Sequence, residues 1–377
     1  MTSAAVATPL RILAVTARYL PLVGGTEIHT YETARRIARS GNDVTVLTTN
    51  PGTNLAEEEW SDGVHIVRVP CWPAQGDYYL APRVARVISR GGWDLVHCQG
   101  VHTLVSPLAM LAAKRANAPY VVTFHSGGHS SRLRTGLRGV QHAVLRPLLA
   151  RAERLIGVSR FEAEFFRARL RLPAERFVVI PNGAHLPDAP PVKGTRKAGP
   201  LIVSVGRLER YKGHQRVIAA LPYVLGSRPD ARVRIVGRGP FEASLRQAAC
   251  ELGVADRVEI GALPASDRAA MASILAEASV VTFLSEYESQ GIAAMEAIQL
   301  KRPVLVADAS ALHELVENGL ASRVAVHSTP QQVAAAILEQ LDRPLIPPDV
   351  ALPTWDNCAE QLLGLYSSVL RGPECAF

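Results

Sequence analysis

Two glutamates, Glu288 and Glu296, lie close together in the segment "YESQGIAAMEA" and bracket a glycine and a short apolar run. Carboxylates in this spacing could bind the hydroxyl groups of a ligand. The apolar segment 279–285 before them predicts a strand, so its exit loop would follow directly and a helix would begin near Gly291.

The two carboxylates would then have different positions. Glu288 would lie in the exit loop and reach a ligand hydroxyl, and the backbone N–H groups of Ser289, Gln290 and Gly291 would point into the same space. Glu296, set back in the second helical turn, could accept two neighbouring hydroxyls such as those of a ribose. Taken singly, Glu296 is better explained as an ordinary helical glutamate.

Two cations follow another expected strand, in the segment "SVGRLERYKGHQ". Arg207 comes one glycine after that strand, and Lys212 follows five residues later, before Gly213. A planar guanidinium and a lysine point charge on one loop suit a diphosphate, which offers several acceptor oxygens. The alternative is that both are solvated loop cations.

Histidines also stand at strand ends. His125 follows the expected strand 120–124, where it would face the ligand, or it could be satisfied by local backbone. His97 and His129 are also near strand ends. The spacing of these histidines does not support a metal site, so we expect no metal.

Paired glycines follow the first expected strand. Gly24 and Gly25 would open a helix that Thr26 caps, and they would let backbone N–H groups approach an anionic ligand closely. An ordinary glycine turn is the alternative. The first strand lacks the GxGxxG motif of dinucleotide sites and the second ends at Thr48-Thr49-Asn50 without an acidic residue, so hydride transfer is disfavoured.

The elements that must position these residues alternate between strands and helices. Helical spacing spans Glu27 to Arg39 and Leu104 to Ala116, for example, and the pattern predicts parallel sheets covered on both faces. Ligands bind outside the carboxyl ends of the strands in such sheets. Short β-branched segments predict strands over 11–16, 43–48, 64–69, 94–98, 120–124 and 154–158, and again over 201–206, 231–237, 257–262, 279–285 and 303–308.

The chain of 377 residues is long enough for two domains. Residues 185–200 are rich in Pro, Gly and Lys without an apolar period, which predicts a linker between two Rossmann-like domains that face each other across a cleft. We expect residues 1–184 to form the first domain and residues 201–355 the second. Residues 356–377 would form a C-terminal helix that packs back toward the first domain.

Composition excludes several other classes. The hydrophobic fraction is 48% and no apolar run is long enough to span a bilayer. The first residues are typical of a frayed tail that leads into a strand, not of a signal peptide. The five cysteines are scattered without C-x-x-C pairs, as in a reduced cytosolic protein. We expect a cytoplasmic protein with no nucleic-acid partner.

Positive charge is concentrated in residues 129–177, which hold eleven arginines and four glutamates. This stretch is either a solvated helical face or a surface for anionic lipid or an anionic substrate. In its first part apolar residues recur at helical spacing: Leu133, Leu137, Val140, Val144 and Leu148. Arginines are interleaved with them: Arg132, Arg134, Arg138 and Arg146. Membrane association would place the protein peripherally at the inner membrane face.

Taken together, these motifs resemble the retaining glycosyltransferases of family 4, which have the GT-B fold. The resemblance extends over nearly the whole chain, including the segments "LIGVSRFE" (155–162) and "VVIPNGA" (178–184). It implies that the first domain binds the acceptor and that the second binds a nucleotide sugar.

The resemblance also implies roles for the residues above. Arg207 and Lys212 would bind the donor diphosphate, Glu296 the ribose, and Glu288 with the following N–H groups the donor sugar. His125 would lie beside the reacting face of the sugar, and Gly24-Gly25 at the phosphates and acceptor. Two positions depart from the family: Ser289-Gln290-Gly291 replaces Gly-Phe-Gly, and Arg302 replaces the glycine before the next strand's proline.

The sequence therefore predicts a metal-independent, retaining glycosyltransferase that uses a nucleotide-diphosphate sugar, expected to be a UDP-sugar, and a hydroxyl acceptor. Its products would be cell-envelope glycans, glycolipids or natural-product glycosides. No DxD-type motif follows a strand near the expected cleft, so cations would stabilise the leaving diphosphate. The alternatives are a nucleotide-sugar epimerase of the same fold, and a nucleotide-sugar-binding protein without turnover.

Overall fold

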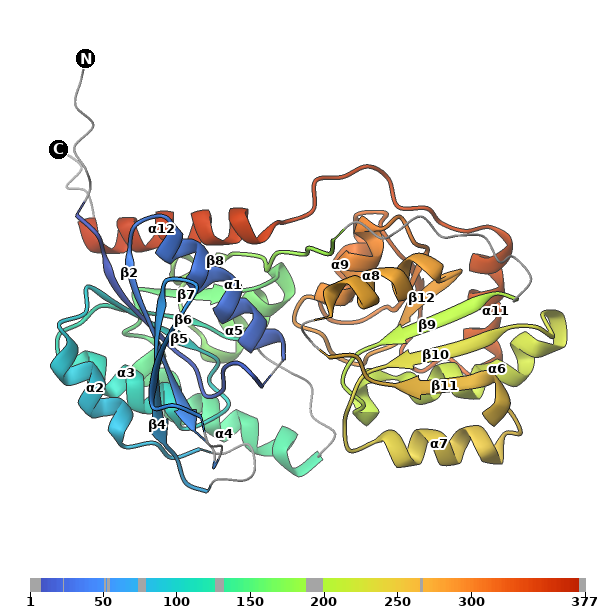
Figure 1. Cartoon of the computed structure of the whole chain (residues 1–377), viewed down its shortest axis with the longest axis horizontal. Coiled ribbons are helices and arrows are strands. Elements are labelled where there is room, and N and C mark those ends of the chain that lie inside the picture. Colours follow the sequence, from blue (N-terminus) through green and yellow to red (C-terminus); the bar gives the residue numbers. More distant parts are fainter. Residues whose placement is uncertain are drawn as a thin grey trace, which may run out of the picture. The chain divides into compact units, whose positions relative to one another are not determined.

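The computed structural model describes residues 8–372 except 23, 51, 53–54, 74–78, 126–131, 188–198 and 265–266, and of 132–138 it describes the backbone alone. The chain divides into two units (Figure 1). The first consists of Met1–Ser126, Leu137–Gly183 and Pro353–Phe377, and the second of Gly127–Gly136 and Ala184–Leu352. Most of the predicted linker, the N-terminal tail and His129 lie outside the described residues.

The first unit is built on an eight-stranded sheet in the order β3-β4-β2-β1-β5-β6-β7-β8. All neighbouring strands are parallel except β3 and β4. The strands are β1 (Arg11–Val15), β2 (Asp43–Asn50), β3 (Glu58–Ser61), β4 (Val64–Pro70), β5 (Leu95–Gln99), β6 (Tyr120–Thr123), β7 (Arg154–Gly157) and β8 (Phe177–Val179).

The central strands are rich in apolar residues because helices cover both of their faces. In β5 every residue is buried, and β2 exposes only its ends. The sequence pattern missed β3, whose residues "EEWS" are all exposed. This short, charged strand lies at the edge of the sheet, where it has no core to fill and where charge discourages pairing with another chain.

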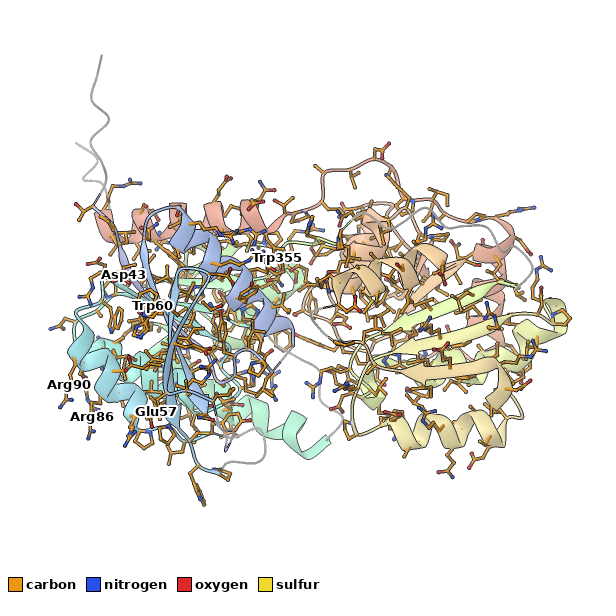
Figure 2. The ribbon with its side chains drawn as sticks, in the orientation of Figure 1. Asp43, Glu57, Trp60, Arg86, Arg90 and Trp355 are labelled. Carbon is orange, nitrogen blue, oxygen red and sulfur yellow. The ribbon has the colours of Figure 1, made fainter. Side chains whose placement is uncertain are left out.

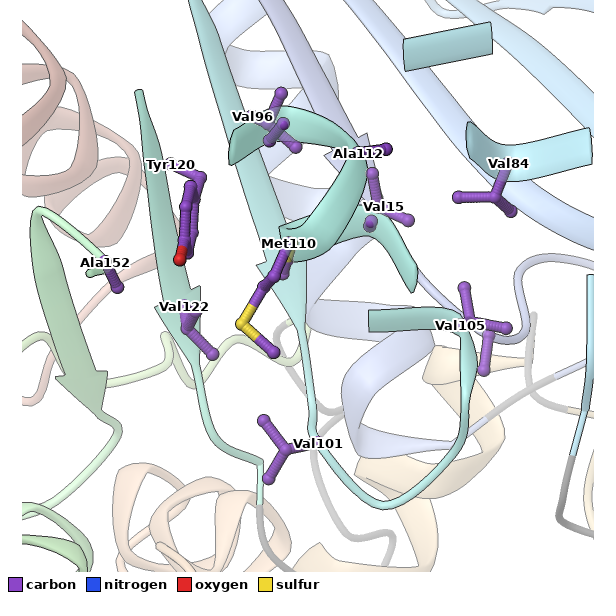
Figure 3. Close-up of a cluster of buried hydrophobic side chains, with 14 of the residues drawn as sticks. Val15, Val84, Val96, Val101, Val105, Met110, Ala112, Tyr120, Val122 and Ala152 are labelled. Carbon is purple, nitrogen blue, oxygen red and sulfur yellow. The ribbon is translucent and has the colours of Figure 1, made fainter. Parts of the chain in front are cut away.

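The helices of the first unit close its core. Met110 of α3 packs with Val96, Tyr120 and Val122 of the sheet in a cluster that also includes α2 residues (Figure 3). The helices are α1 (Gly25–Arg39), α2 (Arg83–Gly91), α3 (Val105–Arg115), α4 (Arg132–Leu149, which belongs to this unit from Leu137 onward), α5 (Arg160–Leu170) and α12 (Trp355–Arg371), with a short 3-10 turn η1 (Ala174–Arg176).

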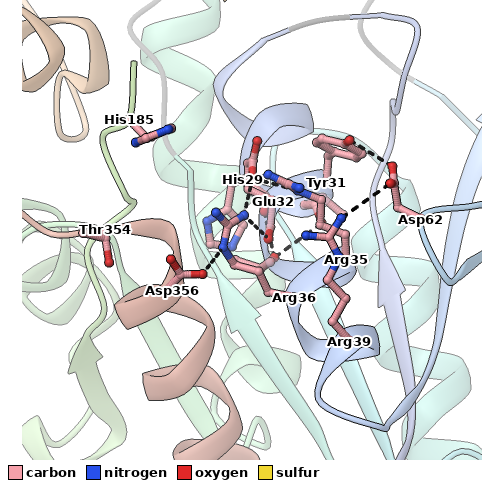
Figure 4. Close-up of polar contacts among 12 residues, drawn as sticks. His29, Tyr31, Glu32, Arg35, Arg36, Arg39, Asp62, His185, Thr354 and Asp356 are labelled. Atoms are coloured by element: carbon pink, nitrogen blue, oxygen red, sulfur yellow. Dashed lines mark hydrogen bonds and ion pairs between the residues drawn. The ribbon is translucent and has the colours of Figure 1, made fainter. Parts of the chain in front are cut away.

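The C-terminal helix α12 packs against α1 of the first unit. Thr354 caps it in a reciprocal capping box with Asn357. Arg36 of α1 bonds to Asp356 at 2.6 Å and also pairs with Glu32 (Figure 4). Trp355, at the start of α12, is buried (Figure 2). Polar contacts and buried apolar surface therefore both fix this helix to the first unit.

The second unit contains a six-stranded parallel sheet in the order β11-β10-β9-β12-β13-β14. Counted within the unit this is the 3-2-1-4-5-6 order of a Rossmann fold, whose strand order reverses between β9 and β12. The strands are β9 (Leu201–Val205), β10 (Arg232–Val236), β11 (Val258–Gly261), β12 (Val280–Phe283), β13 (Val304–Ala307) and β14 (Ser322–Val324).

Helices accompany this sheet as the sequence predicts, and the expected α/β fold with two Rossmann-like sheets is confirmed. The helices are α6 (His214–Ser227), α7 (Glu242–Glu251), α8 (Arg268–Glu277), α9 (Ile292–Gln299), α10 (Leu312–Glu317) and α11 (Pro330–Asp342), with 3-10 turns η2 (Arg210–Lys212) and η3 (Ala255–Arg257). Of the described residues, none belongs to a helix long and apolar enough to cross a membrane.

Candidate active site

Two loops of the second unit meet at the point where its strand order reverses. One follows β9 and carries Arg207 and Lys212, and the other follows β12 and carries Glu288. Gly213 makes the approach possible: its φ is +79°, and a Cβ at this position would lie 2.0 Å from the carbonyl oxygen of Leu284. Only glycine fits there, so the cation loop lies directly against the exit of β12.

Lys212 and Glu288 form a largely buried ion pair, with Nζ and Oε1 2.6 Å apart and side chains 16% and 15% exposed. The hydroxyl of Ser285 donates to the same Oε1 at 2.8 Å. Burial disfavours the ammonium form, but the Glu288 carboxylate outweighs it and raises the pKa of Lys212. The lysine is therefore charged at neutral pH and held at the strand end.

His214 fixes the shape of the cation loop. Its Nε2 donates to the carbonyl oxygen of Arg207 at 3.2 Å, and the Ser204 hydroxyl donates to its Nδ1 at 2.8 Å. Burial lowers the pKa of His214 to about 4, so the ring is neutral. The side chain of Arg207 is 57% exposed and lies 3.4 Å from Glu209, which leaves its guanidinium accessible from solvent.

The segment after Glu288 turns into α9 as expected. Gly291 is the N-cap residue with φ +86°, which favours glycine, and Gln290 is buried against Met295. The backbone N–H of Glu288 donates to the hydroxyl of Ser310 at 2.8 Å. A third strand exit, the one after β13, therefore also contributes to this group of loops.

Glu296 is buried at 4% exposure and pairs with Arg268 of α8. Arg268 also donates to the carbonyl oxygen of His185 at 3.1 Å. Burial raises the pKa of Glu296 to about 6, although the guanidinium of Arg268 acts in the opposite direction. The carboxylate that the sequence assigns to a ribose is thus held by a cation in the structure.

This pKa predicts how stability depends on pH. The folded protein holds the Glu296 proton more tightly than the unfolded chain, so protonation of Glu296 stabilises the folded state. This contribution is fully present below pH 4.5 and is lost as pH rises through about 6. Glu296→Gln should gain about 2 kcal/mol of unfolding free energy relative to wild type over that window. Melting curves recorded well below pH 4.5 and well above pH 6 measure the whole difference, with the exposed Glu286→Gln as control. A difference independent of pH would contradict the assignment.

His125 lies in the first unit, after β6. It adopts a left-handed backbone with φ +45°, which is costly for a side chain of this size. Its Nε2 contacts Oε1 of Gln99 at 2.7 Å, and its ring meets the edge of His29 at 4.4 Å between centroids. Burial, and then the neighbouring histidines, lower its pKa well below the usual value. His125 is therefore a neutral, oriented imidazole.

His97, which the sequence places near a strand end, is enclosed within the first unit. It is buried, and its ring nitrogens bond to the Tyr366 hydroxyl at 2.6 Å and to Thr123 Oγ1 at 2.7 Å. No group of three or more His, Cys, Asp or Glu side chains within the described residues could hold a metal ion.

The glycines after β1 form the start of α1. Gly24 is the N-cap residue without a side-chain cap, so the prediction that Thr26 caps this helix is wrong: Thr26 lies inside the first turn. The buried carboxylate of Glu27 sits beside Gly24 and pairs with Arg18 at 3.2 Å. An acidic side chain thus already occupies the favourable end of the helix dipole. A ligand role for Gly24 and Gly25 remains a prediction.

Several residues that contact the predicted site residues were not identified from the sequence. Gln99 and Ser310 stand at or after strand ends, and that position is the signal that could have found them. Arg268 and His29 lie within helices and gave no such signal. A surface hollow of about 210 Å³ beside β4 and α2 is lined by other residues, among them Arg83, so it does not mark this site.

Family models match both parts of the chain. The model for glycosyltransferase family 4 matches residues 23–186, and the model for glycosyl transferases group 1 matches residues 187–349. Curated relatives include glycogen synthase from Mycobacterium tuberculosis, 28% identical over 89% of this chain and 87% of its own. A phosphatidyl-myo-inositol mannosyltransferase from Mycolicibacterium smegmatis is 29% identical over 85% of this chain and 81% of its own.

Solved structures agree in fold. A sucrose-phosphate synthase from Thermosynechococcus elongatus has a TM-score of 0.79 at 21% identity, covering 95% of this chain and 98% of its own. Anabaena HepE, solved with UDP and glucose, has a TM-score of 0.74 at 20% identity, covering 95% and 100%. With family models matched from residue 23 to residue 349, the chain is a glycosyltransferase that belongs to family 4 and has the GT-B fold.

Proposed function

We propose that this glycosyltransferase takes its sugar from a nucleotide-diphosphate sugar, expected to be a UDP-sugar, and transfers it to a hydroxyl acceptor with retention of anomeric configuration. The main support is the meeting of Lys212 and Glu288 where the strand order of the second unit reverses. This is where Rossmann-like sheets bind nucleotides. The Anabaena relative solved with UDP and glucose supports the same donor class.

Charge explains how such a site could act. A diphosphate gains negative charge as the sugar leaves, and a buried ammonium with a nearby guanidinium would stabilise that charge without a metal ion. Lys212 is held by Glu288 before the donor binds, so it is already in place. Arg207 supplies the accessible guanidinium. The proposal is therefore that cations of the chain itself bind the diphosphate, and that chelators leave the rate unchanged.

The remaining residues would have the roles that the family resemblance implies. Glu288 and the N–H groups of Ser289, Gln290 and Gly291 would bind the donor sugar. Glu296 would bind the ribose after exchanging part of its contact with Arg268 for ribose hydroxyls. In the first unit, His125 would face the sugar. We further propose that residues 1–184 bind the acceptor and 201–355 the donor, joined by the linker 185–200.

Nucleotide release tests this function against its alternatives. Purified protein is incubated with UDP-sugars and GDP-sugars, with and without hydroxyl acceptors, and free nucleotide and products are measured. Acceptor-dependent release supports transfer, whereas conversion of the sugar without an acceptor would identify an epimerase. Binding without either reaction would identify a non-catalytic protein. The anomeric configuration of the product, read by NMR, separates retention from inversion.

We also propose that the basic stretch 129–177 contacts anionic membranes at the cytoplasmic face. The side chains of Arg132, Arg134, Arg138, Leu133 and Leu137 lie outside the described residues, but further along α4 two apolar side chains are accessible: Val140 is 63% exposed and Val144 is 71% exposed. Leu148 packs against the core. Exposed apolar side chains near many arginines suit a charged lipid surface.

Vesicle binding tests the membrane contact. The protein should sediment with anionic vesicles at low salt and be released as salt screens the charges. Replacing Arg132, Arg134 and Arg138 by Gln should abolish sedimentation and leave nucleotide affinity unchanged. The matched control variant carries Gln in place of three arginines outside the basic stretch, Arg83, Arg86 and Arg90 on α2. This variant should still sediment. Absence of sedimentation at low salt would remove the lipid surface and favour a soluble acceptor.

A further inference from the structure

A continuous chain of hydrogen bonds links the C-terminal helix α12 to His125 inside the first unit. The hydroxyl of Tyr366 contacts Nδ1 of His97 at 2.6 Å, and Nε2 of His97 contacts Oγ1 of Thr123 at 2.7 Å. The amide nitrogen of Gln99 lies 3.2 Å from the same Nδ1. The amide oxygen of Gln99 lies 2.7 Å from Nε2 of His125.

The phenol of Tyr366 determines the direction of every bond in this chain. Burial raises the pKa of Tyr366, so the hydroxyl keeps its proton. Among the residues that the structure describes, the one hydrogen-bond partner of the Tyr366 hydroxyl is Nδ1 of His97. A buried hydroxyl proton needs an acceptor, so Nδ1 carries the lone pair. The proton of the neutral His97 ring is therefore on Nε2 and is donated to Thr123.

The orientation of the Gln99 amide follows from that of His97. Because Nδ1 of His97 is an acceptor, it attracts the NH2 end of the amide, and the amide oxygen is left facing His125. A carbonyl oxygen only accepts, so Nε2 of His125 must carry the proton. Nδ1 of His125 then carries a lone pair.

We propose that Tyr366, acting through His97 and Gln99, fixes His125 as the tautomer with its proton on Nε2 and its lone pair on Nδ1. Tyr366, His97 and Gln99 are positioning residues in this proposal. Its consequence for catalysis rests on the proposed function, because it requires His125 to contact the substrate. The tautomer itself is a property of the protein and does not depend on that function.

A fixed tautomer gives His125 a definite specificity. A neutral nitrogen that can only accept selects a hydroxyl, which can donate, and disfavours a phosphate, ether or carbonyl oxygen, which cannot. A sugar hydroxyl is therefore the group that this side chain would bind. The edge contact with His29 and the left-handed backbone at φ +45° restrict where the ring can point. The backbone and the His29 contact thus fix the position of His125, and the hydrogen bonds through Gln99 fix which of its ring nitrogens accepts.

Tyr366→Phe is the informative change because it keeps the ring and removes only the hydroxyl. Nδ1 of His97 could then take a proton, the Gln99 amide could turn over, and His125 could shift its proton to Nδ1. Long-range proton–nitrogen NMR of the full chain with labelled histidine reports each tautomer directly, and His125→Gln assigns its signals. Tyr120→Phe is the matched control: Tyr120 is buried in the same unit and its hydroxyl donates to the carbonyl oxygen of Leu148.

We expect wild type and Tyr120→Phe to show His125 with its proton on Nε2, and Tyr366→Phe to show about a tenfold rise in the other tautomer. An unchanged tautomer in Tyr366→Phe would overturn the proposal, as would wild type with the proton on Nδ1. Once a donor and an acceptor are identified, kcat/KM should fall about tenfold in Tyr366→Phe and stay unchanged in Tyr120→Phe. A fall of about tenfold corresponds to the loss of one hydrogen bond to the substrate. A changed tautomer with unchanged kcat/KM would support the hydrogen-bond chain and remove His125 from the proposed active site.

Discussion

Lys212→Ala is expected to weaken the binding of a nucleoside diphosphate by about 10- to 100-fold, the value of one charge-assisted contact. The ammonium is buried and already positioned by Glu288, so its loss cannot be replaced by solvent. Arg207→Ala should weaken binding as well, and Arg207→Lys should restore only part of it, because a lysine lacks the planar fork. Calorimetry with UDP and GDP measures each affinity.

Lys212→Ala leaves the carboxylate of Glu288 without its buried partner, which lowers stability on its own account. The double variant Lys212→Met with Glu288→Gln removes both charges and separates this effect from lost binding. Lys301→Ala is the matched control: Lys301 lies in the same unit and also forms an ion pair, with Asp349. Affinities equal to wild type in both Lys212→Ala and Arg207→Ala would refute the diphosphate assignment.

The second large effect separates the two glutamates. Glu288→Gln should slow transfer by about 100-fold or more, as expected when a contact to the reacting sugar is lost. It should leave affinity for the free nucleotide near normal, because the proposed partner of Glu288 is the donor sugar and not the nucleotide. Glu296→Gln should weaken even the free nucleotide by about tenfold, because its proposed partner is the ribose. Binding and turnover are measured on the same preparations.

Glu286→Gln serves as the control for both variants, since Glu286 lies in the same loop and is exposed. A thermal melt of each protein shows whether a variant is folded before its activity is compared. Equal losses of nucleotide affinity in Glu288→Gln and Glu296→Gln would end this division of roles. Such a result would mean that the two carboxylates act on the same part of the donor.

The fold could be predicted from the sequence because its signals are local. Buried parallel strands are rich in apolar residues, as in β2 and β5, and the helices between them keep their own period. The edge strand β3 escaped detection because an exposed strand needs no apolar residues. The cap of α1 was misassigned because Gly24 and Thr26 are both plausible caps, and only the backbone path chooses between them.

The chemical types present at the strand ends were also determined by the sequence: two cations after β9, a carboxylate after β12 and a histidine after β6. Which of them meet was decided only by the tertiary structure. Lys212 and Glu288 pair because the strand order places β9 beside β12 and because Gly213 allows the close approach. The links from Glu296 to Arg268 and from His125 through Gln99 and His97 to Tyr366 join residues far apart in the chain. Side-chain direction and burial set these contacts, and neither is encoded in local sequence spacing.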